Sequence, residues 1–156
     1  MSKPYEGWTQ EQIDKYKELL WETDFEKVGE FREKFNLPVS DEGCELPDTA
    51  TLIFMLGHLQ EELTEMTKAI GHRDPIEIAD ATVDLVYVAL GMAHVCNMPW
   101  KELFNEVHRT NMLKERATNP NQSKRGSTLD VIKPVFWQPP DIKGIVEKHF
   151  MAGHDD

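Results

Sequence analysis

Two neighbouring stretches of the chain combine a helical apolar pattern with a high density of acidic side chains. In the first, residues 49–70, apolar residues recur every three or four positions, which is the spacing of an amphipathic α-helix. The second, residues 75–95, opens with the helix-start pattern Asp74-Pro75 and is strongly apolar from Val83 onward. Because only "GHRD" separates them, with Gly71 placed to end the first helix, we expect two antiparallel partners.

The remaining pattern predicts an all-α fold. Capping-box patterns at Thr9 and Thr23 predict helices through "QEQIDKYKELLWE" and "DFEKVGEFREKFN", and a last helix should run from about Pro99 to Ala117. The chain after Ala117 is rich in turn formers and prolines, and "DVIKPVFW" favours at most a short strand. We expect a single domain over residues 1–156: a four-helix-bundle core over 9–117 and an irregular C-terminal arm over 118–156, with Trp137 pinning that arm.

The formal net charge of −11 at pH 7 excludes non-specific nucleic-acid binding, which needs a basic surface. The polar N-terminal sequence carries no secretory signal, and no apolar run reaches membrane-spanning length, so we expect no membrane association. Cys44 and Cys96 lack metal-ligand spacing and should stay reduced. These features favour a cytoplasmic protein.

The acidic residues of the two stretches gather on one side of each helix. At about 100° per residue, those of each helix share an arc of about 100° or less. They are Glu61, Glu62 and Glu65 on the first helix, and Glu77, Asp80 and Asp84 on the second. If the arcs face each other, the carboxylates must either protonate or be neutralised by cations, and oxygen ligands alone favour Mg²⁺ or Mn²⁺. The alternative, a solvated acidic surface, fits Asp84 poorly because the most apolar stretch of the chain follows it.

The residues Glu61-Glu62-x-x-Glu65 and Glu77-x-x-Asp80 resemble the EExxE…ExxD signature of the all-α nucleoside triphosphate pyrophosphohydrolases. That superfamily includes MazG-like enzymes, dimeric dUTPases and phosphoribosyl-ATP pyrophosphohydrolases. The stretches "VGEFREKFNLPV", "ADATVDLVYVALG" and "EVHRTNMLK" followed by "WQPPDI" are similar to a MazG-like subgroup found in phages and some bacteria. The resemblance covers roughly residues 25–146.

The resemblance implies metal-dependent hydrolysis of a nucleoside triphosphate between its α- and β-phosphates, with two or three Mg²⁺ or Mn²⁺ ions per site. It implies four metal ligands, Glu62, Glu65, Glu77 and Asp84. Asp80 is the alternative fourth ligand, because the literal ExxD match ends there, whereas Asp84 directly precedes the aromatic-containing apolar run. Glu61 or Glu62 would orient or deprotonate the attacking water.

The resemblance also implies groups that contact the substrate. Asn111 and Lys114 would contact sugar or phosphate oxygens, and Lys124 and Arg125 could close over the polyphosphate from the "NQSKRGS" loop. His58, one turn before Glu62, would contact the base or sugar, although a packing role is the simpler reading. The segment Asn36-Leu37-Pro38 would line the base pocket.

The expected substrate is a deoxynucleoside triphosphate, with a purine nucleotide such as dGTP favoured. We expect the protein to form a homodimer or homotetramer. It would act in a bacterial cytoplasm, or in the host cytoplasm if a phage encodes it. Four alternatives stay open. They are dUTPase-like activity, dCTPase-like activity, phosphoribosyl-ATP hydrolysis and a non-catalytic acidic binding module. The extra N-terminal segment and C-terminal arm make phosphoribosyl-ATP the less favoured substrate.

Overall fold

A computed structural model describes residues 7–13, 23–38 and 46–152 of the chain. Their contacts divide into two compact units, of which the first ends at Cys96 and the second continues from Asn97. Across the described ranges, none of the helices has the length and apolar character needed to cross a membrane. The mostly helical content confirms the predicted all-α class, and the single domain over residues 1–156 stays a prediction.

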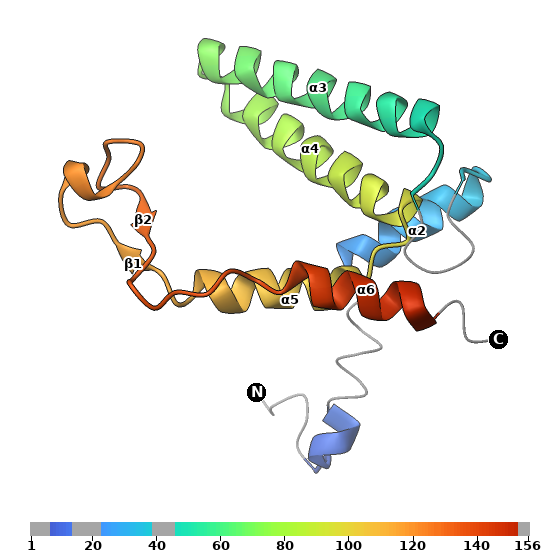
Figure 1. Cartoon of the computed structure of the whole chain (residues 1–156). Helices are drawn as coiled ribbons and strands as arrows, with labels where there is room; N and C mark the ends of the chain where they lie inside the picture. The colour runs from blue at the N-terminus through green and yellow to red at the C-terminus, as the bar shows by residue number, and fades with distance from the viewer. Residues whose placement is uncertain (1–6, 14–22, 39–45, 153–156) are drawn as a thin grey trace. The chain divides into compact units, whose positions relative to one another are not determined.

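Three helices form the described body of the first unit: α2 (Asp24–Lys34), α3 (Thr49–His72) and α4 (Pro75–Val95). As Figure 1 shows, α3 and α4 run antiparallel side by side, and α2 packs against α4. The predicted antiparallel pair is therefore confirmed. Local hydrogen bonds explain the helix starts, since the predicted capping box of Thr23 with Glu26 forms and the Asp48 carboxylate accepts the Thr51 N–H at 2.7 Å.

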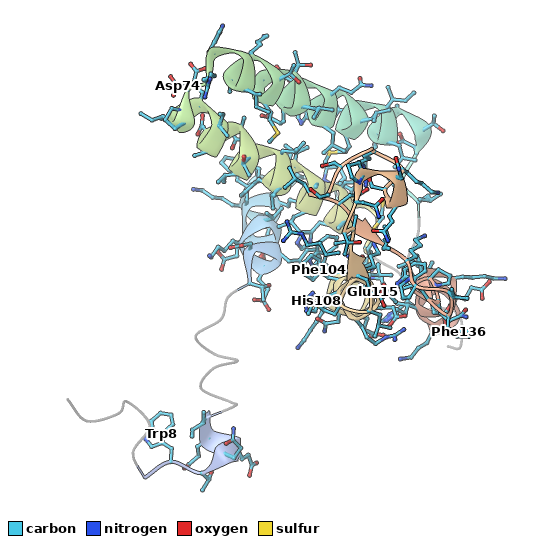
Figure 2. The ribbon with its side chains drawn as sticks, turned by 90° about the vertical axis from the view of Figure 1, so that its left-hand side faces the viewer. Trp8, Asp74, Phe104, His108, Glu115 and Phe136 are labelled. Atoms are coloured by element: carbon cyan, nitrogen blue, oxygen red, sulfur yellow. The ribbon has the colours of Figure 1, made fainter. Side chains whose placement is uncertain are left out.

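The connection between α3 and α4 is short and capped on both sides. The predicted helix end at Gly71 is wrong, because α3 continues through Gly71 to His72 and Arg73 takes the left-handed conformation, with φ of 56°. Asp74 then caps α4 by accepting the N–H groups of Ile76 at 2.9 Å and Glu77 at 3.3 Å. Figure 2 shows Asp74 at this turn. The helix ends late because Pro75 disfavours the helical region for the residue before it, which places the break at Arg73-Asp74.

Small and medium-sized apolar side chains form the buried core of the first unit. The buried apolar residues there are Val28, Met55, Ala69, Ala81, Leu90, Ala93, Val95 and Cys96. Gly29 of α2 lies against the His94 ring of α4, which stacks on the Phe25 ring at 3.8 Å between centroids and hydrogen-bonds to the Phe25 carbonyl at 2.6 Å. The close approach of α2 to α4 therefore depends on the missing Cβ at Gly29.

Part of the predicted apolar stripe of α3 faces away from this core. Leu56, Leu63 and Ile70 are 50%, 54% and 57% exposed, whereas Met55 is buried. These three follow one another at intervals of seven, so they form a single row along α3. We call Leu56, Leu63 and Ile70 the exposed row.

Before α2, the structure describes a helical turn at residues 10–13. The predicted capping box of Thr9 with Gln12 is present, with Thr9 N–H to Gln12 Oε1 at 2.9 Å and Gln12 N–H to Thr9 Oγ1 at 3.2 Å. Residues 14–22 of the predicted first helix lie outside the described residues.

The second unit contains α5 (Trp100–Asn111), β1 (Glu115–Arg116), the short 3₁₀ helix η1 (Pro120–Gln122), β2 (Val131–Ile132) and α6 (Ile142–Ala152). The predicted helix end near Ala117 is wrong, because α5 ends at Asn111 and the chain enters β1, which pairs antiparallel with β2. The short strand expected within "DVIKPVFW" is confirmed. The arm was predicted to be irregular, but it contains the helix α6. This helix begins after Asp141, whose Oδ1 accepts the Gly144 N–H at 2.9 Å.

Side-chain contacts hold the arm onto α5. The Trp137 indole donates to the Thr110 carbonyl at 2.8 Å, which confirms the pinning role expected for this residue. Glu106 accepts two hydrogen bonds from the Arg109 guanidinium, both at 2.8 Å, and one from the Asp141 N–H at 3.1 Å. The N-terminal end of α6 is therefore fixed to α5 through Glu106.

Candidate active site

The acidic residues of α3 surround one carboxyl group, that of Glu62. Its Oε2 atom is buried and has no hydrogen-bond partner among the described residues. Burial raises the pKa of Glu62, and so do the negative charges of Asp84, Glu65 and Glu61, in that order of effect. Because Asp84 belongs to α4, its influence on Glu62 means that the acidic arcs of the two helices approach each other here.

The other predicted ligands are more open. The side chains of Glu61, Glu65 and Asp84 are exposed. Asp80 is also exposed, and Glu77 lies near the start of α4 with its carboxylate 3.9 Å from His72 Nδ1. Within the described ranges, no three Asp, Glu, His or Cys side chains come close enough to form a ligand group by themselves. The structure thus brings Glu62 near Asp84, Glu65 and Glu61, and gives no such proximity for Glu77 or Asp80.

The chemistry of this donor set nevertheless fits a hard divalent cation. The Glu62 oxygen is buried without a donor among the described residues and lies near carboxylates of both α3 and α4, and such a group normally needs a proton or a cation as its partner. Carboxylate oxygens without histidine or cysteine suit Mg²⁺ or Mn²⁺. The residues that could hold such an ion are Glu62 with Asp84, Glu65 and Glu61.

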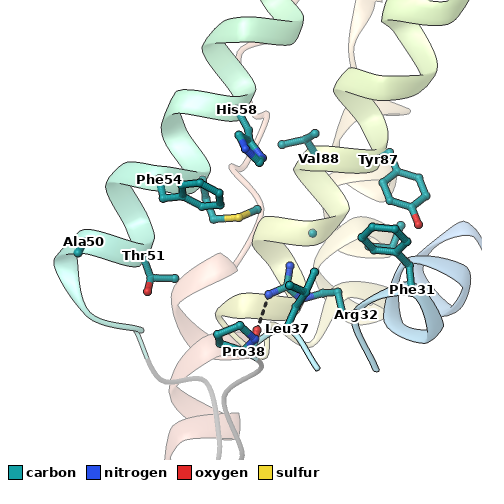
Figure 3. A pocket seen from close by; sticks show the side chains of 13 residues that line it. Phe31, Arg32, Leu37, Pro38, Ala50, Thr51, Phe54, His58, Tyr87 and Val88 are labelled. Carbon is teal, nitrogen blue, oxygen red and sulfur yellow. Dashed lines mark hydrogen bonds between the residues drawn. The ribbon is translucent and has the colours of Figure 1, made fainter. Parts of the chain in front are cut away.

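A pocket of about 450 Å³ lies among α2, α3 and α4, and its lining includes His58, which precedes Glu62 by four positions (Figure 3). Its wall is mainly apolar and aromatic, with Phe31 from α2, Phe54 from α3 and Tyr87 from α4. Of the segment Asn36-Leu37-Pro38 expected along a base pocket, Leu37 and Pro38 line it and Asn36 does not. Such a concave, largely apolar space with a few polar groups is typical of a site for a small organic ligand.

His58 links the pocket to the acidic group. It lines the pocket, is half-buried, and packs against the Phe54 ring at 4.4 Å between centroids. It also counteracts the rise in the pKa of Glu62, which places it next to that carboxylate. The ring contact supports the packing role, and its position at the pocket is also suited to the predicted contact with base or sugar.

One polar group of the pocket was not among the predicted site residues. Arg32 is only 7% exposed, donates from Nη2 to the Pro38 carbonyl, and has a buried Nε without a partner among the described residues. A sequence signal for it exists, because Arg32 follows Val28 by four positions and therefore shares the buried face of α2. The position of this arginine on that face, between Phe31 and Phe35 in the sequence, indicates a buried cation.

The remaining predicted substrate contacts belong to the second unit. Asn111 ends α5, and the ammonium group of Lys114 lies 5.6 Å from the centroid of the Trp137 ring. Lys124 is exposed, and Arg125 pairs with Asp130 at 2.9 Å inside its own loop. Their contacts with a substrate stay predictions.

Comparison with known families gives a match over the same helices. The model of the phosphoribosyl-ATP pyrophosphohydrolase family matches residues 28–111, more than half of the 156-residue chain. This range contains α3, α4, α5, Arg32 and all six acidic residues named above. A comparison with curated proteins gives no match. The chain therefore belongs to the phosphoribosyl-ATP pyrophosphohydrolase family, within the MazG-like all-α superfamily of pyrophosphohydrolases that act on nucleotide-like substrates.

Proposed function

We propose that this protein hydrolyses a deoxynucleoside triphosphate, with a purine base favoured, to the monophosphate and pyrophosphate. The observation that carries the proposal is the buried Glu62 oxygen, which has no hydrogen-bond partner in the described part of the chain, one helical turn from a residue that lines a nucleoside-sized pocket. Family membership supports the cleavage of a pyrophosphate bond. The triphosphate would lie along the acids of α3 and α4, and the nucleoside would enter the pocket past His58.

The proposed ligands of Mg²⁺ or Mn²⁺ are Glu62, Glu65, Glu77 and Asp84, with Asp80 as the alternative to Asp84, for two or three ions per site. When bound, these ions would neutralise the polyphosphate, polarise the attacked phosphorus and activate water. Without such compensation, a triphosphate would be repelled by a chain of net charge −11.

The chain's own groups would handle the water and the leaving group. Glu61 or Glu62 would orient the water and accept its proton. Asn111, Lys114, Lys124 and Arg125 would donate to sugar or phosphate oxygens. The protein would act on a nucleotide pool in the cytoplasm.

Phosphoribosyl-ATP is the second candidate substrate, because the matching family is described by that activity. Its phosphate groups make the same demands on the acids, and its adenine is likewise a flat ring. dUTP and dCTP complete the set of substrates that the site could accept.

A substrate panel tests the proposal. The full-length protein is incubated with each deoxynucleoside triphosphate and with phosphoribosyl-ATP, in Mg²⁺ or Mn²⁺, and products are identified by chromatography. We expect a monophosphate and pyrophosphate in equal amounts from at least one deoxynucleotide. Turnover of phosphoribosyl-ATP alone would favour the second candidate. No product from any substrate, with no rise in melting temperature on adding metal, would favour a non-catalytic acidic binding module.

A further inference from the structure

Arg32 lines the pocket, and its guanidinium is a group of hydrogen-bond donors there. Arginine is a donor-only side chain with five N–H groups. One hydrogen bond, from Nη2 to the Pro38 carbonyl, is described for it, and the buried Nε has no partner among the residues that the structure describes. No carboxylate pairs with Arg32 anywhere in the described ranges. Burial without a counter-ion lowers the pKa of the guanidinium, which is the expected cost of removing this charge from water.

The groups around Arg32 suit a flat ring. Phe31 and Tyr87 lie edge to face at 5.6 Å between centroids, and Phe54 packs against His58. Figure 3 shows Arg32 and Pro38 at one end of the pocket and His58 at the other. The pocket-lining residues of α3, from Ala50 to His58, span about 12 Å at 1.5 Å per residue, and Glu62 follows one turn later. A nucleotide with its phosphates at Glu62 would therefore direct its base toward Arg32.

We propose that Arg32 selects the base of the substrate, favouring guanine through its O6 and N7 acceptors. This inference rests on the proposed function and names the residue responsible for its base preference. Guanine places two acceptors side by side, and bidentate contact with arginine is its commonest specific recognition. Adenine replaces O6 with an amino group, which opposes an N–H donor. Uracil and thymine offer a single carbonyl at the corresponding edge.

Base analogues test the proposal on the unmodified protein. The values of kcat/KM for pyrophosphate release are compared for dGTP, dITP, dATP and the triphosphate of 2-aminopurine deoxyriboside. Because dITP keeps O6 and N7, it should match dGTP. The other two lack O6 and should fall by about 10- to 100-fold, the discrimination typical of one bidentate pair. Equal turnover of dGTP and dATP would overturn the proposal.

Variants separate base selection from the structural bond to Pro38. Arg32→Lys keeps the charge and a donor for the Pro38 carbonyl but lacks the planar pair of donors. It should lower kcat/KM for dGTP by at least about 10-fold and leave that for dATP nearly unchanged. An equal loss for both nucleotides would assign Arg32 a structural role only. Arg109→Lys, outside the pocket, is the matched control and should change neither value.

Binding of free nucleosides keeps the test independent of catalysis. Deoxyguanosine and deoxyadenosine carry no phosphate and need no metal, so calorimetric titration of each reports on the pocket alone. If no nucleotide is hydrolysed but deoxyguanosine binds more tightly by the same factor, the proposed function fails and the role of Arg32 stands. Equal binding of both nucleosides, or binding of neither, would overturn the role of Arg32 as well.

Discussion

At the scale of single residues, the Glu62 carboxyl group combines burial with three acidic neighbours, and each of these effects raises its pKa. Such a group is poorly stabilised by the protein alone. The clustering of acids around Glu62 is explained if a cation binds there together with the substrate. The cation then neutralises the negative charge that the folded chain concentrates at this place.

Glu65→Gln tests this account of the acids. Since Glu65 follows Glu61 and Glu62 by four and three positions, its neutralisation removes two like-charge contacts on α3 and should stabilise the metal-free protein by about 0.5 kcal/mol. Turnover should fall by at least about 100-fold, because a proposed ligand is lost. Urea unfolding without metal and pyrophosphate release provide the two readouts.

The control for that variant is Glu33→Gln, which removes an exposed charge from α2 and should leave turnover unchanged. A loss of several kcal/mol of stability in metal-free Glu65→Gln would instead mean that Glu65 supports the fold.

The sequence indicated the acidic residues because their spacing alone puts them on one helix face. It did not indicate the role of Arg32, because the importance of this residue depends on three helices and the segment ending at Pro38, which surround it from distant parts of the chain. The proximity of Glu62 to Asp84 was predictable, whereas the openness of Glu77 and Asp80 depends on side-chain directions that periodicity does not give.

At the scale of elements, the packing of α2 on α4 depends on Gly29. A Cβ added there would lie 2.9 Å from His94 Cε1, and that ring cannot move easily because it stacks on Phe25 and bonds to its carbonyl. Overpacking costs about 1–3 kcal/mol, against a gain of about 1 kcal/mol in helix propensity. Gly29→Ala should therefore lower the free energy of unfolding by about 1 kcal/mol.

The matched variant is Gly71→Ala in α3, where an added Cβ meets nothing within 4 Å. It should raise the free energy of unfolding by about 0.5 kcal/mol through helix propensity. Equal effects of the two substitutions in urea unfolding would show that α2 and α4 do not approach each other closely at Gly29.

In the second unit, Glu106 links stability to pH. The Arg109 hydrogen bonds, and then the Asp141 N–H, lower its pKa from 4.5 to about 2. A carboxyl group with a depressed pKa in the folded state stabilises that state above its unfolded pKa, and this contribution is lost as pH falls. The loss should occur between pH 4.5 and about pH 2, and Glu106→Gln should flatten this part of the stability profile.

Thermal unfolding monitored at several pH values measures this effect, with Glu115→Gln as an exposed control that should retain the slope. An unchanged slope in Glu106→Gln would mean that Glu106 is not held in the contacts described.

Helix starts were predictable to the residue where a cap defines them, as at Thr23 and Asp74, because the hydrogen bonds are local. The end of α5 was not, since Ala117 donates its N–H to the Asp130 carbonyl at 3.0 Å and β1 pairs with β2. That competition involves residues more than ten positions away. The helix α6 was missed for a different reason, because the prolines before Asp141 resemble those of an extended arm.

At the scale of the whole molecule, the exposed row leaves three large apolar side chains of α3 at least half exposed along one line of the helix. We propose that a second copy of the chain covers it, giving the expected homodimer or homotetramer. Sedimentation velocity should show at least twice the mass of one chain, and Leu56→Glu with Leu63→Glu should shift the protein toward the monomer. A wild-type monomer at all concentrations would contradict this proposal.

The tight connection at Arg73-Asp74-Pro75 has a consequence for how chains of this kind can vary in length. The two caps, Arg73 and Asp74, are adjacent, so no uncapped residue separates the helices. One added residue that lengthened a helix would shift α4 along α3 and rotate its acids by about 100°. Insertions and deletions should therefore be tolerated poorly between His72 and Ile76. Point substitutions that preserve the left-handed residue and the aspartate cap should be accepted there far more readily.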